Sequence, residues 1–373
     1  MQEPSQAPIP SPPPADAEGQ RILRSLRPGQ MLVPVALSLL AVGYLMYTQF
    51  DVQQFRGIVW TPRTFAWLAL ALGALAVRHL FYTFRLHTLT EGAFSWGKCL
   101  RLMVLWEFSA SLTPTNKGGP FVMLFVLTRE RLAAGRTAAA VFYAMVCDAG
   151  FFVLSLPVLL SWYGPAMLYP GASTFSEVWV ASGVFFSTYA FMCTYWSMLV
   201  FFLFIRPQYA RRALSWLARR PVFSKRADTL HRLGQEFELA AQEMRAQGWR
   251  YHLSVVVGTI GAWTCKFLMI NCLIIAIVPS TPLDGSTQAF VYARMVAMFI
   301  IMATAPTPGG AGIAEILFAK LIADFVPGKG VATVVALIWR GMAYYGYLLL
   351  GALVVPAWVA RQVNMREGEK PRE

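Results

Sequence analysis

Several charged residues stand inside stretches of sequence that are otherwise apolar, and these residues are the most able to do chemistry. They are Lys117, Asp148, Arg294, Glu315 and Arg340. In hydrocarbon a charged side chain costs at least about 2.5–3.5 kcal/mol, so it needs a partner or a function. A guanidinium suits a phosphate because its planar fork donates two parallel hydrogen bonds. The residue types therefore indicate a site for a phosphate-bearing group.

Each of these charges has two interpretations. Arg340 either pairs structurally with Asp148 or contacts a phosphate. Glu315 either braces a hairpin or lines the site. Arg294 and Lys117 either contact a headgroup or pair locally with their neighbours. Three further charges in apolar segments are expected to be paired, to reach toward water or to face a cavity: Arg78, Glu107 and Lys266.

Two short runs rich in proline and glycine interrupt the apolar segments that carry these charges. They are TPTNKGGP at 113–120 and APTPGG at 305–310. Proline ends a helix and paired glycines permit a tight reversal, so each run predicts the tip of a helical hairpin. A helix that begins after such a tip directs partial positive charge toward an anion. The site residues expected at the tips are Gly118, Gly119, Pro308, Gly309, Gly310 and Gly312.

The composition places these segments in a membrane. Of 373 residues, 57% are hydrophobic and only 14% are charged, whereas a soluble domain carries about 25% charged residues. The apolar residues form blocks of about 20, which is the length that crosses a bilayer. A soluble enzyme is excluded. The net charge of +13 comes from basic residues between the blocks, which indicates topology and lipid contact rather than nucleic acid.

We expect an all-α polytopic membrane protein with six full spans and two hairpins. The hairpins pair 95–112 with 119–131, and 287–304 with 310–326. Broken backbone at membrane depth is tolerated only inside the protein or around water, so both hairpins are expected to be re-entrant. The six spans lie near residues 31–50, 64–84, 137–161, 178–205, 252–278 and 331–357.

The order of these segments repeats once along the chain. A span, a hairpin and a span occupy about residues 63–161 and again about residues 251–357. The first unit begins on one side of the membrane and the second on the other, which predicts two oppositely oriented hairpins in an inverted repeat. In transporters of this design, broken helices meet near the midplane and form the substrate site.

The remaining segments are expected to be peripheral. Residues 1–20 form a disordered Pro-rich tail, residues 21–360 the transmembrane domain and residues 361–373 a basic tail. Residues 206–250 form a basic amphipathic loop that either lies on the membrane surface or docks a partner. Cysteines and histidines show no metal-ligand spacing, and GxxxxGK[ST] and GxSxG do not occur. We therefore expect no cofactor and no catalytic activity.

The sequences around both glycine runs resemble a known family. ASLTPTNKGGP and LTRERLAAGRTAAAVFYAMVCDAGFFVLSL, and later APTPGGAGIAE and ALIWRGMAYYGYLLLGAL, are similar to the lysylphosphatidylglycerol synthase/flippase transmembrane domain family over roughly residues 31–360. The resemblance implies a lipid flippase or a role with lipid-linked glycans, and the soluble aminoacyltransferase domain of fused members is expected to be absent. Pro120 and Met123 stand where the family often has an acidic residue and an arginine. Matching positions are Gly118, Gly119, Asp148, Pro308, Gly309, Gly310, Gly312, Glu315 and Arg340.

These features predict a flippase that moves a phosphate-bearing headgroup across an inner cell membrane. Its lipid would be an anionic phospholipid or a polyprenyl-phosphate-linked lipid. Two alternatives stay open: a membrane-embedded transferase acting on polyprenyl-phosphate sugars, and a scaffold for a separately encoded lipid-modifying enzyme. A transferase would need a carboxylate cluster at the water interface, and no DxD motif occurs.

The basic residues predict that both termini and residues 206–250 face the cytoplasm, because 23 of the 32 Lys and Arg residues then lie inside. A cysteine introduced at Ser173 should react with an impermeant thiol reagent added outside, and one introduced at Ser224 should not. The opposite labelling pattern would overturn both the orientation and the inverted repeat that depends on it.

Overall fold

The structure, a computed structural model, is all-α in the part of the chain that it describes, and its ranges contain no strand. The expected fold class is thereby confirmed. The span expected at 31–50 and the tail at 1–20 lie outside the described residues. Those residues are 60–113, 118–172, 174–220, 227–303, 305, 310, 313–326 and 328–367.

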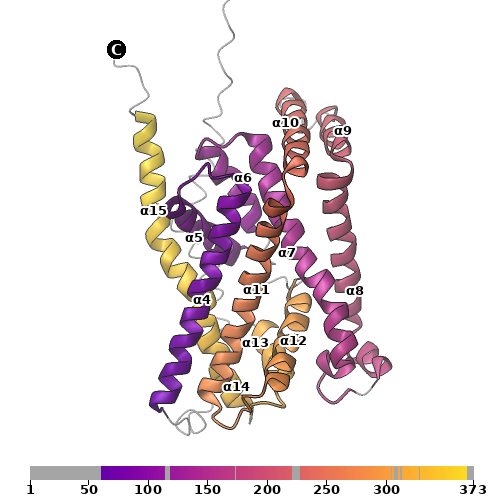
Figure 1. Cartoon of the computed structure of the whole chain (residues 1–373), viewed down its shortest axis with the longest axis vertical. Coiled ribbons are helices and arrows are strands. Elements are labelled where there is room, and N and C mark those ends of the chain that lie inside the picture. Colours follow the sequence, from indigo (N-terminus) through magenta and orange to yellow (C-terminus); the bar gives the residue numbers. More distant parts are fainter. Residues whose placement is uncertain are drawn as a thin grey trace, which may run out of the picture.

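The helices form one elongated bundle (Figure 1). Two of the elements, η2 and η4, are single π-helical turns that continue α8 and α14, and η1 is a short 3-10 turn. In chain order the elements are α4 Pro62–Leu89, α5 Trp96–Leu112, α6 Gly118–Arg129, α7 Ala134–Tyr163, η1 Pro165–Met167, α8 Phe175–Val200, η2 Phe201–Ile205, α9 Pro207–Ala218, α10 Ala227–Ala246, α11 Trp249–Ile277, α12 Gly285–Met302, α13 Ile313–Leu321, α14 Lys329–Arg340, η4 Gly341–Tyr345 and α15 Gly346–Glu367.

Six helical stretches in the described ranges are long and apolar enough to cross a membrane. Five of them correspond to the spans expected at and after residue 64, and most of their boundaries shift by a few residues. The sixth, Gly285–Met302, is the first arm of the second expected hairpin. The stretches are Pro62–Leu89, Ala134–Tyr163, Phe185–Ile205, Trp249–Ile277, Gly285–Met302 and Gly330–Arg361.

Both expected hairpins are present as helix pairs in contact, α5 with α6 and α12 with α13. The second arm of each pair is short: α6 has 12 residues and α13 has 9. At about 1.5 Å per residue these arms reach about 18 and 14 Å, well below the roughly 30 Å of a hydrocarbon core. Neither short arm can cross a membrane on its own, and re-entrance of the hairpins stays a prediction.

The two units run in opposite directions along the bundle. In Figure 1, α4 ascends and α11 descends beside it, while α7 descends and α15 ascends. The pair α5–α6 lies in the upper part of the bundle, and α12–α13 lies in the lower part. The arrangement follows the inverted order expected from the sequence. It brings α4 and α11, the opening helices of the two units, into the most extensive packing.

Glycines on α11 allow this close packing. A Cβ at Gly258 would lie 3.0 Å from the Cβ of Arg85 and 3.2 Å from the carbonyl oxygen of Phe81. A Cβ at Gly261 would meet the Phe81 ring at 2.6 Å. Small residues let helix backbones approach closely in membranes, where apolar surface alone does not drive helices together. Gly258 thereby lets the base of the Arg85 side chain pack against α11.

The amphipathic loop at 206–250 folds as α9 and α10, which pack against each other and, through α10, against α7. The carboxylate of Glu236 accepts a hydrogen bond from the backbone N–H of Gly135 at 3.2 Å, and Arg211 pairs with Glu238 at 3.0 Å. These contacts hold the helix pair on the end of the bundle that carries the first hairpin.

Gly310, at the second hairpin tip, has a φ of +70°, which is the left-handed region that L-residues rarely adopt. A Cβ there would lie 2.9 Å from the terminal methyl of Met302. Gly310→Leu should therefore lower the melting temperature of the detergent-solubilised protein, since the backbone alone costs about 1–2 kcal/mol.

The matched control is Gly285→Leu at the start of the same hairpin, where no atom lies within 4 Å of an added Cβ and φ is not positive. It should leave the melting temperature nearly unchanged. Equal melting temperatures for the two variants would show that Gly310 does not set the reversal.

Candidate functional site

A cavity of about 520 Å³ lies in the bundle between α4, α5, α7, α8, α11 and the end of α14. Its walls take side chains from both apolar clusters of the protein, one built around each hairpin. Arginine, lysine and carboxylate side chains from five helices reach this space. They are Arg78, Arg85, Glu107, Asp148, Lys266 and Arg340.

Arg85 and Asp148 form a double hydrogen-bonded ion pair between α4 and α7. Arg85 Nη1 lies 2.7 Å from Asp148 Oδ1, and Nη2 lies 3.2 Å from Oδ2. Thr259 accepts a further hydrogen bond from Arg85 Nη1 at 3.2 Å, and the indole N–H of Trp263 donates to Asp148 Oδ1 at 3.0 Å. The Arg85 side chain is only 3% exposed. Its charge is therefore stabilised by the Asp148 carboxylate and the Thr259 hydroxyl rather than by water.

A second pair joins α4 to α5. Arg78 Nη2 donates to both carboxylate oxygens of Glu107 at 2.9 Å, and Nη1 donates to the hydroxyl of Tyr347 at 3.1 Å. That hydroxyl also lies 3.1 Å from Nδ1 of His79, whose Nε2 faces the carbonyl of Leu100 at 3.2 Å. Because a carbonyl only accepts, Nε2 of His79 donates to Leu100. Arg78 is thus bound on both sides.

Lys266 differs from these arginines. Its ammonium lies 4.7 Å from the ring centre of Trp263 and 4.5 Å from that of Phe299. Aromatic faces attract a cation, and more strongly when water is excluded. No hydrogen bond or ion pair joins this ammonium to any other described residue. Lys266 therefore brings a positive charge into the cavity without bringing a carboxylate with it.

Arg340 ends α14 at the point where the helix widens into the π-helical turn η4. Its guanidinium carbon lies 4.3 Å from the ring centre of Tyr344, and the Tyr344 hydroxyl donates to the carbonyl of Ser111 at 3.2 Å. Such π turns interrupt the regular helical hydrogen bonding and are frequent at functional sites. This turn connects the second unit to the last turn of α5, next to the first hairpin tip.

The cavity opens sideways toward the surface that contacts lipid. Phe121 on α6, and Phe191 and Met198 on α8, line the cavity and are also exposed, at 69%, 53% and 47%. Phe191 and Met198 lie on a helix that is long enough to cross a membrane, where exposed large apolar side chains face hydrocarbon, and Phe121 borders the same opening from the shorter α6. The cavity therefore combines charged inner walls with an apolar side opening.

The first hairpin tip borders the cavity. Gly118 begins α6, and its N–H donates to the Thr113 hydroxyl at 3.0 Å. Gly119 packs so closely against Trp106 that an added Cβ would lie 3.0 Å from the indole. Pro120, the position that departs from the family pattern, lines the cavity directly.

Arg294 lies elsewhere. It is 1% exposed and is not among the residues that line the cavity. Its Nη2 pairs with Asp324 at 2.6 Å, and its other hydrogen bonds go to the carbonyls of Leu321 and Ala166 at 2.7 and 3.2 Å. The local-pairing interpretation fits this environment, and the structure places Arg294 as a brace between the two arms of the second hairpin.

Several expected site residues lie outside the described part of the structure. Glu315 lies on α13, but its side chain is outside the described part. The others outside the described residues are Lys117, Pro308, Gly309 and Gly312.

The structure also assigns partners that differ from those considered above. Asp148 pairs with Arg85, not with Arg340. The expected span at 64–84 stops one residue before Arg85, which places this arginine in a cytoplasmic loop. In fact α4 continues to Leu89, and Arg85 is buried. One signal was available: Arg78 and Arg85 are two helical turns apart and so share one face of α4.

The Arg85–Asp148 pair makes a specific stability prediction. Asp148→Asn should destabilise the protein by about 3–5 kcal/mol, because it leaves a buried guanidinium without its carboxylate. Arg85→Gln combined with Asp148→Asn should recover most of that loss, as measured by thermal unfolding in detergent.

Asp284→Asn is the matched control. Asp284 is exposed and caps the first turn of α12 by accepting from the Thr287 N–H at 2.8 Å, a role that asparagine fills equally well. It should change stability little. Additive losses in the double variant would show that Arg85 and Asp148 are not coupled.

Comparisons with known proteins agree with this architecture. The family model described as "Lysylphosphatidylglycerol synthase TM region" matches residues 31–351. A curated "UPF0104 membrane protein" from Archaeoglobus fulgidus is 26% identical over 270 residues, which cover 69% of this chain and 74% of that protein. No solved structure matches the chain. The family match covers most of the sequence, and it confirms the resemblance drawn from the glycine runs. The chain is a multi-pass membrane protein that belongs to the lysylphosphatidylglycerol synthase transmembrane-region family.

Proposed function

We propose that this protein carries a phosphate-bearing lipid headgroup across the membrane through the charged cavity. The cell's inner membrane, with both termini in the cytoplasm, is the proposed location. The protein is proposed to move its lipid without changing it chemically. The lipid class is an anionic phospholipid or a polyprenyl-phosphate-linked lipid.

The observation that carries the proposal is Lys266. A charge in a low-dielectric interior is costly unless it is paired. The two neighbouring arginines, Arg78 and Arg85, each pair with a carboxylate, whereas Lys266 contacts two aromatic rings and pairs with no carboxylate among the described residues. An anionic headgroup entering the cavity would supply the missing negative charge. Such an attraction is stronger in a low-dielectric interior than in bulk water.

Arg340 supports the same proposal. It lines the same cavity from the second unit, and its planar fork can take two phosphate oxygens. The ring of Tyr344 contacts the Arg340 guanidinium through its face. The two cations approach the space from α11 and α14, so a phosphate there would be held from two helices.

The side opening lets the chains of a lipid stay outside the cavity. A lipid headgroup is polar but its chains are apolar, so moving the chains from hydrocarbon into a charged cavity would be unfavourable. The exposed Phe121, Phe191 and Met198 form a border where chains can stay in the bilayer. With the headgroup inside, the protein replaces the hydration that the phosphate would lose in hydrocarbon.

Lys266→Met tests the proposal because it removes the charge but keeps most of the side-chain volume. In proteoliposomes it should slow translocation of a headgroup-labelled phosphatidylglycerol by about 10- to 100-fold, as expected for loss of one contact to a charged group. Its melting temperature should stay the same or rise, because a buried charge without a carboxylate is removed.

Lys320→Met is the matched control, since Lys320 is exposed, lies near the Tyr169 ring at 5.6 Å and does not line the cavity. It should translocate at the wild-type rate. Wild-type translocation by Lys266→Met would contradict the assignment of the cavity as the route. Donor-dependent formation of a new lipid by the purified protein, detected by mass spectrometry, would favour the transferase instead.

A further inference from the structure

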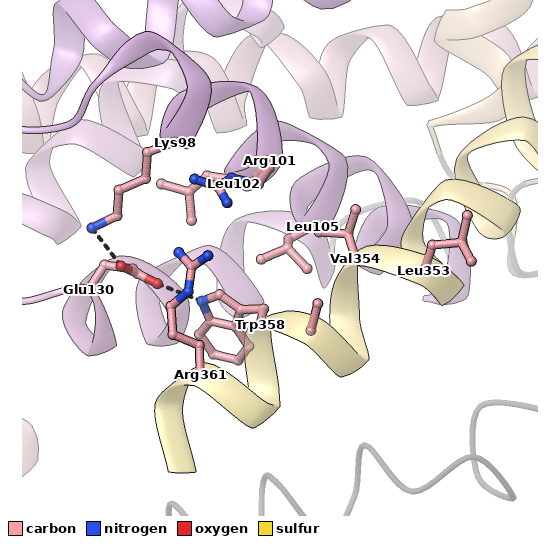
Figure 2. Close-up of a pocket in the computed structure, with 10 residues that line it drawn as sticks. Lys98, Arg101, Leu102, Leu105, Glu130, Leu353, Val354, Trp358 and Arg361 are labelled. Atoms are coloured by element: carbon pink, nitrogen blue, oxygen red, sulfur yellow. Dashed lines mark hydrogen bonds and ion pairs between the residues drawn. The ribbon is translucent and has the colours of Figure 1, made fainter. Parts of the chain in front are cut away.

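A second, smaller cleft lies on the other side of α5. It has a volume of about 170 Å³ and runs between α5, the end of α6 and the outer part of α15. Figure 2 shows Lys98, Arg101, Leu102 and Leu105 on one side and Val354, Trp358 and Arg361 on the other, with Glu130 beside the lysine. The central cavity uses the opposite face of α5, including Met103, Trp106 and Glu107. The two spaces are therefore separate.

One part of this cleft is apolar and open to the bilayer. Leu102 and Leu105 are buried, whereas Leu353 is 74% exposed. Leu349 and Leu350, one turn earlier on α15, are exposed as well, at 69% and 49%. A run of exposed leucines on a membrane-spanning helix faces hydrocarbon, so this end of the cleft is continuous with the lipid chains.

The other part is basic. Among the described residues that line the cleft, Glu130 is the one carboxylate, and its two oxygens accept from Lys98 Nζ and Trp358 Nε1, each at 2.6 Å. Its side chain is only 6% exposed. Arg101 and Arg361 are exposed and line the same cleft. The described lining thus holds three basic side chains and one carboxylate, so its net charge is positive.

Trp358 indicates where the basic rim lies relative to the membrane. Tryptophan concentrates where hydrocarbon meets headgroups, with its ring in the apolar region and its N–H toward the polar side. Here its ring lies edge-on to Phe125, at 6.5 Å, and its N–H points to Glu130. The basic rim is therefore at the headgroup level of one leaflet, and the leucines are at the level of the chains.

We infer that this cleft binds an anionic phospholipid, with its phosphate between Arg101 and Arg361 and one acyl chain along Leu102, Leu105 and Leu353. The volume favours a lipid over a soluble metabolite. Sites that enclose a small ligand measure about 300–1,000 Å³, so a cleft of 170 Å³ holds only part of a molecule, and the bilayer accommodates the rest.

Such a lipid would join α5 to α15. Both helices also reach the central cavity region, α5 through Glu107 and α15 through Tyr347, which binds Arg78. The bound lipid is a resident of the cleft and is distinct from the lipid proposed to be transported. A phosphate here bridges an arginine on each helix at the point where Lys98 on α5 already meets Glu130 at the end of α6.

Native mass spectrometry of the full-length protein tests this inference. Lys266→Met serves as the background, so that the central cavity contributes little, and the probes are phosphatidylglycerol, phosphatidylcholine and inorganic phosphate. Arg101→Gln with Arg361→Gln should weaken phosphatidylglycerol binding about 30-fold, or about fivefold for each arginine. Phosphatidylcholine and inorganic phosphate should bind far more weakly than phosphatidylglycerol.

Two further variants separate the cleft from general surface charge. Arg212→Gln with Arg219→Gln removes two exposed arginines, one on α9 and one directly after it, that do not line the cleft, and it should leave binding unchanged. Ala357→Phe fills the apolar part while keeping every charge, and it should weaken phosphatidylglycerol binding as well. The inference is overturned by equal loss in the α9 pair, by unchanged binding in Ala357→Phe or in the Arg101/Arg361 pair, or by inorganic phosphate binding as tightly as the lipid.

Discussion

Two guanidinium–carboxylate pairs on one face of α4 determine how the first half of the bundle is assembled. Arg78 reaches α5 through Glu107, and Arg85 reaches α7 through Asp148. A buried charge that loses its partner costs several kcal/mol, so neither α5 nor α7 can rotate about its axis without a large penalty. The space between the helices is thus bounded by polar contacts of fixed length. An apolar core would instead close to a density that leaves no room for a ligand.

The sequence was sufficient to predict the helices and hairpins but not the ion-pair partners of the buried charges. Hydropathy located the spans at 64–84, 137–161, 178–205, 252–278 and 331–357, because about 20 apolar residues have few uses other than crossing a bilayer. The glycine and proline runs located both hairpins for an equally local reason. Pairing is not local. Whether Asp148 meets Arg340 or Arg85 depends on the rotation of three helices, and hydropathy and motif spacing do not specify those angles.

The predicted helix ends were the second source of error, because residues just beyond them were assigned to loops. Arg85 lies one residue after the expected span, where a basic residue ordinarily faces water, yet α4 extends beyond it and buries it. Lys266, like Arg78, was expected from the sequence to be paired or to reach toward water. Of its two aromatic neighbours, Trp263 lies one turn earlier on the same helix, whereas Phe299 comes from α12, which only the fold brings close. The glycines at 309 and 312 and the side chain of Glu315 stay predictions.

The distribution of charge over the two units makes the two halves of the cavity chemically different. In the described lining, both carboxylates come from the first unit, whereas Lys266 and Arg340 come from the second. The helices of the two units follow the same order in opposite directions, but the charged side chains that they bring to the described lining do not. The two faces of the cavity are therefore not equivalent, and a headgroup inside it would meet carboxylates from one unit only among the described residues.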